Sequence, residues 1–347
     1  MTTTFISIIM STLLMLLLLF FLLSPVISLA AERCHPDDKA AILKFKNSFS
    51  NGPQVLSSWT PDRDCCTIFD CDETTNRVTD FTLTYFNLAG TIPDAIADLT
   101  YLQTLRLRKM PFLIGEIPQS LTKLKYLRSV EISWTNVSGD VPPFLSQLKN
   151  VVFIDLSFNN LSGSIPSSLA TLPNLIGLDL SRNRLTGSIP ESFGHLVSQD
   201  PQGLSLSLSH NMLTGEIPAS LGKTNFYNFD VSRNNLSGDA SMLFGASKIA
   251  ASVDISRNNF EFDLSPVSFM TAELVALDLS HNKIYGKISF QILDAFVLQH
   301  LNVSYNRLCG KIPSPWKLRY RVEGFEFDNS TYLHNRCLCG SPLAPCK

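Results

Sequence analysis

Charged residues of opposite sign recur in two columns along this 347-residue chain, and both columns repeat about every 24 residues. The first column has six acids at seven consecutive positions: Glu131, Asp155, Asp179, Ser207, Asp230, Asp254 and Asp278. The second column, three residues later, is mostly aromatic or basic: Trp134, Phe158, Arg182, His210, Arg233, Arg257, His281 and Tyr305. Two such columns could form a surface that binds a charged partner. They could also be solvated faces that neutralise each other, and the sequence leaves both interpretations open.

Catalytic motifs are not found in the sequence. It has no G-x-S-x-G nucleophile elbow, no H-E-x-x-H metal motif and no glycine-rich phosphate loop. His195, His210, His281 and His300 fall in different repeats and are expected to be separate surface residues. We therefore expect a protein that is not an enzyme and that needs no cofactor.

A repeated segment accounts for the spacing of both columns. FIDLSFNNLSGSIP, from Phe153 to Pro166, recurs as GLDLSRNRLTGSIP, SLSLSHNMLTGEIP and HLNVSYNRLCGKIP. The first core residue of each copy belongs to a series of ten: Phe81, Leu105, Val130, Ile154, Leu178, Leu206, Phe229, Val253, Leu277 and Leu301. This spacing, with an Asn usually five residues later, matches the leucine-rich repeat signature. The sequence predicts an α/β solenoid of ten repeats, a right-handed superhelix with a parallel β-sheet on its concave face.

Strand alternation predicts the direction of each side chain within a repeat. Ile154 and Leu156 should point into the core, whereas Asp155 and Ser157 should point to solvent on the concave face. One further column is all asparagine: Asn159, Asn183, Asn211, Asn234, Asn258, Asn282 and Asn306. An amide side chain can satisfy backbone groups where the chain leaves the sheet, so we expect a structural ladder.

Two segments depart from the regular spacing. A step of 28 residues includes His195 to Gly203, for which we expect a longer convex loop. A step of 25 residues includes RKMPFLIG, from Arg108 to Gly115, which lacks the ladder Asn.

The two ends of the chain differ from the repeats. Residues 1–31 hold an uncharged apolar run followed by small residues, which favours a cleaved signal peptide over a retained membrane anchor. No second run of that length follows, so a receptor kinase is not expected. Residues 32–77 should form an N-terminal cap with a helix over Asp38–Phe49. The repeats would occupy 78–313, and 314–347 would form a C-terminal cap.

Eight cysteines lie in two groups of four, one in each cap: Cys34, Cys65, Cys66 and Cys71, then Cys309, Cys337, Cys339 and Cys346. An even count in a secreted chain favours disulfides, and neither group has the paired C-x-x-C spacing of a zinc site. A bond between the adjacent Cys65 and Cys66 would be strained. The remaining choices are Cys34–Cys65 with Cys66–Cys71, which we favour, or the crossed pairing. In the second group we favour Cys309–Cys337 and Cys339–Cys346.

Net charge and glycosylation motifs limit the classes of partner that the chain is expected to bind. The formal net charge is −2, so nothing points to nucleic acid. Five sequons predict N-glycosylation in a secreted protein, at Asn136, Asn160, Asn235, Asn302 and Asn329. The first three directly follow the ladder position and should lie at an exposed rim.

The chain as a whole resembles the polygalacturonase-inhibiting proteins of plants. The matching segments are CHPDDKAAILKFK, SWTNVSGDVPPFLSQLKN, LSFNNLSGSIPSSL, LNVSYNRLCGKIP and the C-terminal HNRCLCGSPLAPCK. The resemblance implies a protein of the cell wall and apoplast that binds and inhibits endopolygalacturonases of fungi and insects in defence. It also implies that the concave strands contact the enzyme and that a basic column binds pectin, that is, homogalacturonan.

Carried onto this chain, the resemblance assigns the acidic column, with Ser207, to enzyme binding. The pectin-binding positions would be Arg182, Arg233, Arg257 and Lys283. Thr67 to Asp70 leads directly to Cys71, whereas family members usually carry a longer segment with a Trp there. An alternative is a non-inhibitory secreted recognition protein that acts as a soluble co-receptor or receptor partner. Ice binding, known in one relative, would require a flat uncharged array that the charged concave face does not offer.

Overall fold

The computed structural model describes residues 33–196, 201, 203–245, 247–269, 273–295, 297–313 and 329–347. The chain divides into two compact units, Met1–Arg33 and Cys34–Lys347, and the second contains nearly all of the described residues. The predicted signal peptide, most of the loop within the 28-residue step and the first part of the C-terminal cap lie outside the described residues.

The N-terminal cap is built on α2 (Pro36–Asn47), followed by α3 (Gly52–Val55), the short 3₁₀ helix η1 (Cys65–Thr67) and β1 (Asp70–Cys71). Pro36 starts α2, His35 Nδ1 accepts a hydrogen bond from the Asp37 N–H, and acids and lysines occupy the first and last turns respectively. The helix thus starts and ends two residues before the predicted 38–49. Phe45 covers the open end of the first coil, with its ring 4.9 Å from that of Phe81.

A buried ion pair fixes this helix to the first strand. Asp38 is fully buried and accepts from Arg77 Nη2 at 2.6 Å and from the Val78 N–H at 2.7 Å. The carboxylate therefore has a compensating charge and a backbone donor, which a buried charge requires.

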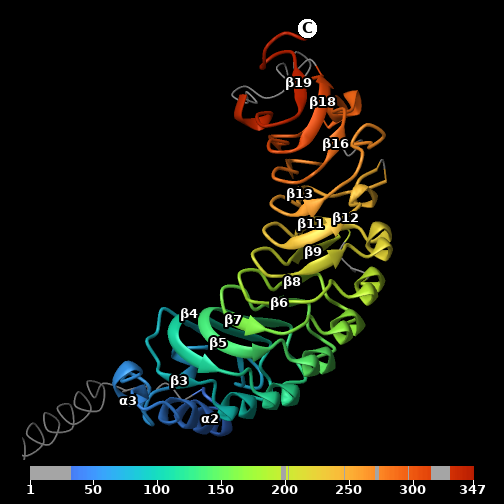
Figure 1. Cartoon of the computed structure of the whole chain (residues 1–347). Coiled ribbons are helices and arrows are strands. Elements are labelled where there is room, and N and C mark those ends of the chain that lie inside the picture. The colour runs from blue at the N-terminus through green and yellow to red at the C-terminus, as the bar shows by residue number, and fades with distance from the viewer. Residues whose placement is uncertain are drawn as a thin grey trace, which may run out of the picture. The chain divides into compact units, whose positions relative to one another are not determined.

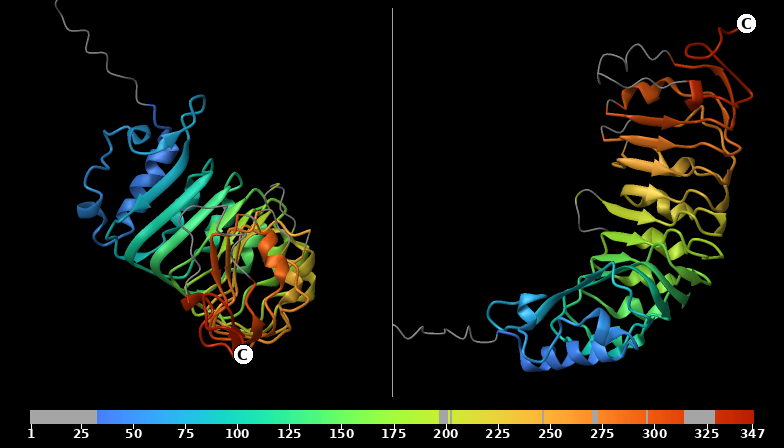
Figure 2. Two further views of the ribbon diagram at one scale, coloured as in Figure 1. Left: turned by 90° about the horizontal axis from the view of Figure 1, so that it is seen from above. Right: turned by 90° about the vertical axis from the view of Figure 1, so that its left-hand side faces the viewer.

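Ten parallel strands form the main sheet, one for each predicted repeat (Figures 1 and 2). They are β2 (Val78–Thr84), β4 (Thr104–Gly115), β5 (Ser129–Asp140), β6 (Phe153–Asp155), β8 (Gly177–Asp179), β9 (Leu204–Ser207), β11 (Phe226–Asp230), β13 (Ser252–Asp254), β15 (Ala276–Asp278) and β17 (His300–Asn302). β1 adds an antiparallel edge next to β2. All ten predicted core residues are buried, from Phe81 to Leu301. The prediction of a leucine-rich repeat solenoid is confirmed.

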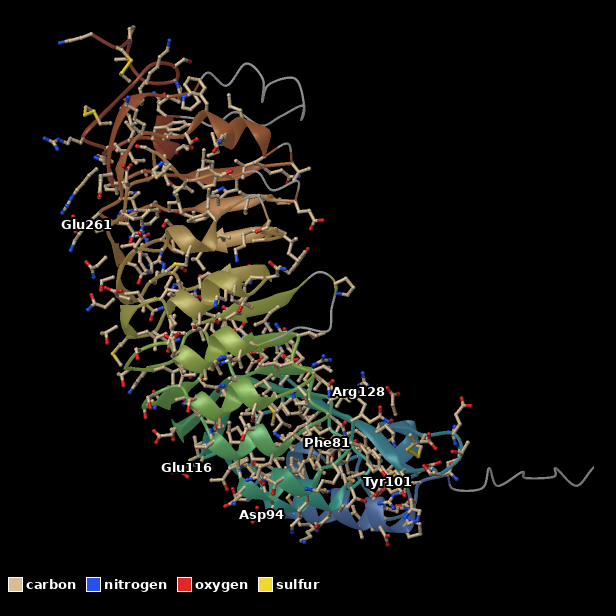
Figure 3. All side chains as sticks on the ribbon, turned by 90° about the vertical axis from the view of Figure 1, so that its right-hand side faces the viewer. Phe81, Asp94, Tyr101, Glu116, Arg128 and Glu261 are labelled. Atoms are coloured by element: carbon tan, nitrogen blue, oxygen red, sulfur yellow. A yellow bond between two sulfur atoms is a disulfide. The ribbon has the colours of Figure 1, made fainter. Side chains whose placement is uncertain are left out.

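Short 3₁₀ helices cover the outer side of this unit, opposite the main sheet (Figure 1). They are η2 (Asp94–Asp98), η3 (Gln119–Lys123), η4 (Pro143–Gln147), η5 (Ser167–Thr171), η6 (Glu191–His195), η7 (Ala219–Lys223), η8 (Ser241–Leu243) and η9 (Phe290–Asp294). Six of them begin directly after a proline of the repeat, such as Pro166, whose extended backbone sets the start of the helix. Figure 3 shows Phe81 inside the coil, with Asp94 and Glu116 on its outer side.

Short strands pair along one edge between the main sheet and the helices. β3 (Gly90–Thr91) pairs with β4, and β7 (Asn160–Ser162) pairs with β5. Two further sheets are β10 (Thr214–Glu216), β12 (Asn235–Gly238) and β14 (Asn259–Phe260), then β16 (Tyr285–Gly286), β18 (Arg307–Lys311) and β19 (Cys337–Cys339). β4 and β5 each run for 12 residues from the main sheet to this edge. The irregular segment Arg108–Gly115 thus continues as strand where other repeats turn at the ladder Asn.

The asparagine ladder joins neighbouring coils as predicted. Asn183 Oδ1 accepts from the Leu161 N–H at 3.0 Å, and Nδ2 donates to the carbonyls of Leu156, Leu180 and Ser181. Asn335, in the C-terminal cap, adds a further rung by bonding to the backbone of Val303 and Leu308. Its position in the cap sequence did not identify it as a member of the column.

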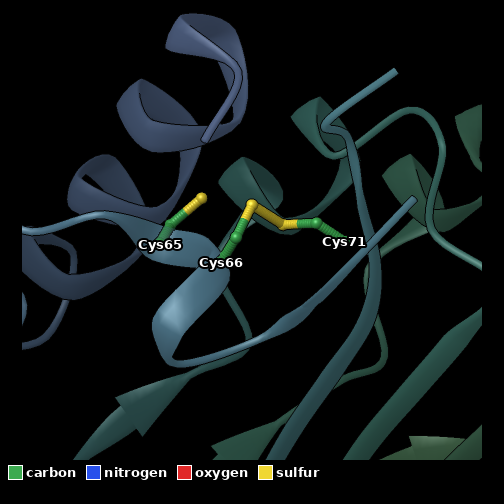
Figure 4. A group of neighbouring side chains, drawn as sticks. All are labelled: Cys65, Cys66 and Cys71. Carbon is green, nitrogen blue, oxygen red and sulfur yellow. A yellow bond between two sulfur atoms is a disulfide. The ribbon is translucent and has the colours of Figure 1, made fainter. Parts of the chain in front are cut away.

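Four disulfides close the two caps, with the pairs Cys34–Cys65, Cys66–Cys71, Cys309–Cys337 and Cys339–Cys346. Figure 4 shows the sulfur of Cys66 bonded to that of Cys71, whereas the neighbouring sulfur of Cys65 is not part of that bond. Because these sulfurs are in disulfides, they cannot serve as the thiolate ligands of a metal. In the C-terminal cap, η10 (Asn329–Thr331) precedes β19, and Cys309–Cys337 links β18 to β19.

The concave face as a candidate binding surface

The acidic column forms one row across the main sheet. Strand register places Glu131 beside Asp155, Asp155 beside Asp179, and Asp179 beside Ser207, and the row continues through Asp230, Asp254 and Asp278 to Asn302. Neighbouring strands lie about 4.8 Å apart, so the row spans most of the sheet. The structure therefore brings together all seven residues that were assigned to enzyme binding.

The aspartates of this row are half-buried, and each holds a backbone donor of its own coil. Oδ1 of Asp155 accepts from the N–H of Ser157 at 2.8 Å, and Asp254 does the same with Ser256 at 2.9 Å. Asp179, Asp230 and Asp278 make the equivalent bond. The acids thus have a structural role in addition to any binding role, because each satisfies an N–H that would otherwise lack a partner.

Ser157 was expected on the solvent-exposed concave face, but its side chain is not exposed to solvent. Ser157 is only 4% exposed, and the serines at the same position of later repeats are also buried. A serine is short, and at the spacing of neighbouring strands the longer side chains of the two flanking columns cover it. The concave surface therefore consists of two rows of long side chains with a floor of serines between them.

Burial changes the protonation of this row. Desolvation raises the pKa of Asp254 to about 6, against the lowering effect of the hydrogen bonds from Ser256, and the charges of Asp230 and Asp278 add to the rise. Burial also raises the pKa of Asp155. Asp254 therefore loses its negative charge as the pH falls from neutral toward 5.

Glu131 differs from the aspartates of the row. It is 8% exposed and bound by Arg106 Nε at 2.5 Å, with Arg108 Nε at 3.4 Å and Ser133 Oγ at 3.1 Å. A carboxylate with these partners presents little charge to another molecule. Glu131 lies in the row as expected, but two arginines on the preceding strand β4 cover it.

The second column has an unusual backbone. Trp134, Phe158, Arg182 and the later members have positive φ values of 53–54°, a conformation that costs energy for residues with a side chain. Stacking compensates, since the rings of Trp134 and Phe158 lie 3.6 Å apart and Arg182 lies 4.7 Å over Phe158. Tyr305 likewise stacks on His281 and on His334 of the cap.

Two further members of this column were missed. Tyr85 and Lys109 share the positive φ and stand four residues after Phe81 and Leu105, as Trp134 does after Val130. That constant offset could have identified both from the sequence. Lys109 connects them to the stack, with Nζ 4.6 Å from the Tyr85 ring and 5.9 Å from the Trp134 ring.

A polar groove of about 470 Å³ lies between the two columns in the C-terminal half of the sheet. Arg182, Arg233 and Arg257 line one side, and Asp230, Asp254 and Asp278 line the other. Three of the four predicted pectin-binding residues therefore lie together. Lys283 does not line the groove, because it follows the ladder Asn282 and its N–H bonds to Phe260 at the edge of the sheet.

The histidines of the groove carry little positive charge at neutral pH. Burial and the nearby Arg182 and Arg233 lower the pKa of His210, and burial and Arg257 lower that of His281. His210 Nδ1 is buried and has no hydrogen-bond partner among the described residues. The fixed positive charge of the groove therefore comes from its arginines.

Comparisons with known proteins identify the family. Models of the leucine rich repeat N-terminal domain and the leucine rich repeat match residues 35–68 and residues 150–172, 174–196, 204–224 and 297–318 respectively. A polygalacturonase inhibitor of Pyrus communis is 51% identical over 94% of this chain and 95% of its own length. Polygalacturonase inhibitor 2 of Arabidopsis thaliana is 50% identical over 92% and 94%. This chain belongs to the polygalacturonase inhibitor family.

Solved structures give the same fold. A plant ice-binding protein superposes with a TM-score of 0.84 and 43% identity, covering 91% of this chain and 99% of that protein. The leucine-rich repeat ectodomain of the Arabidopsis thaliana receptor kinase GASSHO1/SCHENGEN3, solved with CASPARIAN STRIP INTEGRITY FACTOR 2, gives a TM-score of 0.68 and 31% identity. It covers 79% of this chain and 32% of that chain. Family membership thus rests on the inhibitor sequences, and the fold is shared more widely.

The predicted glycosylation sites fall in different surroundings. Asn136 and Asn235 are exposed at the edge of the sheet, Asn160 is half-exposed there, and Asn329 is exposed in the C-terminal cap. Asn302 lies in the acidic row, where Nδ2 donates to Asp278 and Oδ1 accepts from the N–H of Ser304. Among the described residues, no helix has the length and apolar character required to cross a membrane.

Proposed function

We propose that this protein is secreted to the plant apoplast and cell wall, where it binds and inhibits endopolygalacturonases of fungi or insects. The observation that carries the proposal is the row of carboxylates in register across the concave sheet, in a chain about half identical to named inhibitors. A polygalacturonase must bind a polyanionic substrate, so basic groups are expected around its cleft. Asp155, Asp179, Asp230, Asp254 and Asp278, with Ser207 between them, would contact that basic rim.

The geometry favours a fast and salt-sensitive association. The aspartates are anchored at Oδ1 by backbone N–H groups, so they need little ordering when a partner binds. Charges fixed in a row steer a partner of opposite charge, and this steering weakens as salt rises. Glu131 would contribute least of the row, since its charge is already bound by arginines.

We further propose that the groove arginines bind demethylated pectin. Arg182, Arg233 and Arg257 line one side of the groove and present guanidinium groups suited to carboxylates. Lys283 would act as an additional, peripheral contact because it lies outside the groove. Pectin would then hold the inhibitor in the wall where the enzymes act.

A panel of purified fungal and insect endopolygalacturonases tests the inhibitory function. Titration of the folded protein into each enzyme should give inhibition of at least one, stronger at low than at high salt. The rival function is recognition of a receptor ectodomain or its ligand, and the fold of the GASSHO1 ectodomain, solved with a bound factor, favours it as second candidate. Recovery of a receptor ectodomain and no glycanase from a cell-wall extract would support that rival.

A further inference from the structure

A cluster of cations occupies the N-terminal part of the concave face, where the sign of the surface charge is reversed. Arg106 lies in register with Glu131, in the row that is otherwise mostly acidic. Arg108 lies in register with Ser133, in the column that is buried serine in the later repeats. Lys109 follows directly. The cluster therefore belongs neither to the acidic row nor to the arginine groove.

A buried carboxylate orients the two arginines. The side chain of Glu131 is 10% exposed, and it binds Arg106 Nε at 2.5 Å and lies 3.4 Å from Arg108 Nε. The side chains of Arg106 and Arg108 are themselves 44% and 46% exposed. Among the described residues, their contacts with acceptors go through Nε, so their terminal N–H groups are free to bind a ligand. Two guanidinium groups held in place in this way lose little conformational entropy when they bind a carboxylate.

The balance of charge in the cluster is positive. Three cations, Arg106, Arg108 and Lys109, stand against one carboxylate, Glu131, which leaves +2. The neighbouring strand β2 places Thr82 beside Arg106 and Thr84 beside Arg108, and its acid, Asp80, lies beside Thr104. Asp80 accepts a hydrogen bond from Thr82 Oγ1. The arginines are thus bordered by hydroxyls on β2, and an anion could approach them without meeting a second exposed acid at the same register.

An open aromatic face adjoins the cations. Tyr85 is 69% exposed, and Lys109 Nζ lies 4.6 Å from its ring centroid and donates to its Oη at 2.6 Å. Tyr85 is the first ring of the stacked column, and no other ring or cation packs on it among the described residues. Lys109 therefore holds the hydroxyl end of the ring, and most of the Tyr85 side chain remains exposed for a ligand.

These two features select one class of ligand. Carboxylates bind guanidinium forks, and the apolar C–H face of a pyranose ring packs on an open aromatic face. Arg106, Arg108 and Lys109 extend over about 10 Å of β4, with Tyr85 directly after the neighbouring strand β2. This length suits a short saccharide, whereas a protein partner usually covers about 800 Å². We propose that Arg106, Arg108, Lys109 and Tyr85 form a binding site for an acidic oligosaccharide, separate from the groove.

Calorimetric titration with trigalacturonate tests the site. The titrated protein carries Arg182→Gln, Arg233→Gln and Arg257→Gln, which remove the positive charges of the groove. This variant should still bind trigalacturonate and not the neutral galactotriose. Adding Lys109→Gln or Tyr85→Ala, neither of which touches Glu131, should weaken binding roughly threefold each, and Arg106→Gln with Arg108→Gln roughly tenfold or more. Arg184→Gln, an exposed arginine in another repeat, is the matched control and should change nothing.

The outcomes separate this site from the other functions. Affinity within twofold of the parent for both Lys109→Gln and Tyr85→Ala would overturn the proposal, and so would equal binding of galactotriose. Equal binding of triglutamate, with the same dependence on Tyr85, would show an acidic-peptide site instead. The arginine pair needs a melting curve, because its loss leaves the buried Glu131 unpaired. The site does not depend on enzyme inhibition, so a negative inhibition panel would leave the sugar titration unaffected.

Discussion

Asp254 Oδ1 lies 2.9 Å from the backbone nitrogen of Ser256, two residues further along the same coil. The carboxylate that could contact a partner is therefore also part of the local fold. The same bond recurs at Asp155, Asp179, Asp230 and Asp278. At Asn302 an amide takes the carboxylate's place and accepts from the N–H of Ser304 at 3.2 Å. The chain itself thus shows that asparagine can keep the structural bond without the charge.

Folding stability should depend on the protonation of Asp254. Its folded pKa of about 6 lies above the ordinary value of 3.8, so the folded state holds the proton more tightly. Stability is then greatest below pH 4 for this group and falls as the pH rises to 6, by about 2 kcal/mol for a side chain still partly in water. Asp254→Asn should remove this dependence, as measured by denaturant unfolding at pH 4 to 7.5. Asp239→Asn, an exposed aspartate with the same bond to Ser241, should leave it unchanged.

Loss of one rung of the asparagine ladder should destabilise the solenoid. Asn183→Ala removes an acceptor for the Leu161 N–H and a donor to three carbonyls, which should cost roughly 1–3 kcal/mol. Asn174→Ala is the control, because Asn174 makes a single exposed bond to the Lys149 carbonyl. A thermal midpoint of Asn183→Ala equal to that of the control would show that the ladder does not support the fold.

Pectin binding should depend on the groove arginines. Arg233→Gln with Arg257→Gln should weaken binding to demethylated pectin roughly tenfold, since each change removes a charge-assisted contact. The remaining attraction should fall steeply with salt, because exposed charges are screened within about 8–10 Å. Lys283→Gln should have a smaller effect, as expected of a residue outside the groove. Equal losses from Lys283→Gln and from the arginine pair would place the binding site at the edge of the sheet instead.

Regular spacing made most of the fold predictable. The ten core residues and the asparagine column follow from a period of about 24 residues, and the structure buries or bonds them as predicted. The same period would have located Tyr85 and Lys109, at a constant offset from the core residue.

The environment of individual side chains was not predictable in the same way. The burial of Ser157 and the raised pKa of Asp254 depend on residues in neighbouring coils, about 24 positions away. The alternation of residues within one strand does not show how the side chains of neighbouring coils pack against it. The pairing of Glu131 with Arg106 and Arg108 arises because the irregular second repeat places arginines where later repeats place acids and serines. Sequence reasoning marked that repeat as irregular but assigned it no role.

The backbone hydrogen bonds of the aspartates limit which variants can test the acidic row. Replacing Asp230 and Asp254 by Lys would remove the acceptors for Ser232 and Ser256 as well as the charges, so a loss of activity could reflect misfolding. Asp230→Asn with Asp254→Asn keeps both acceptors and removes only the charge, as Asn302 does naturally. The matched control is Asp239→Asn, which removes one exposed negative charge outside the row.

The inhibition titration with these variants tests the central claim most directly. Folded wild-type protein should inhibit at least one endopolygalacturonase of the panel at low salt, and Asp230→Asn with Asp254→Asn should raise the inhibition constant by about tenfold or more, with a melting temperature no lower than that of wild type. Asp239→Asn should inhibit as well as wild type. Inhibition by the double variant equal to that of wild type would contradict the role of the acidic row, and no inhibition of any enzyme by folded wild-type protein would contradict the inhibitory function itself.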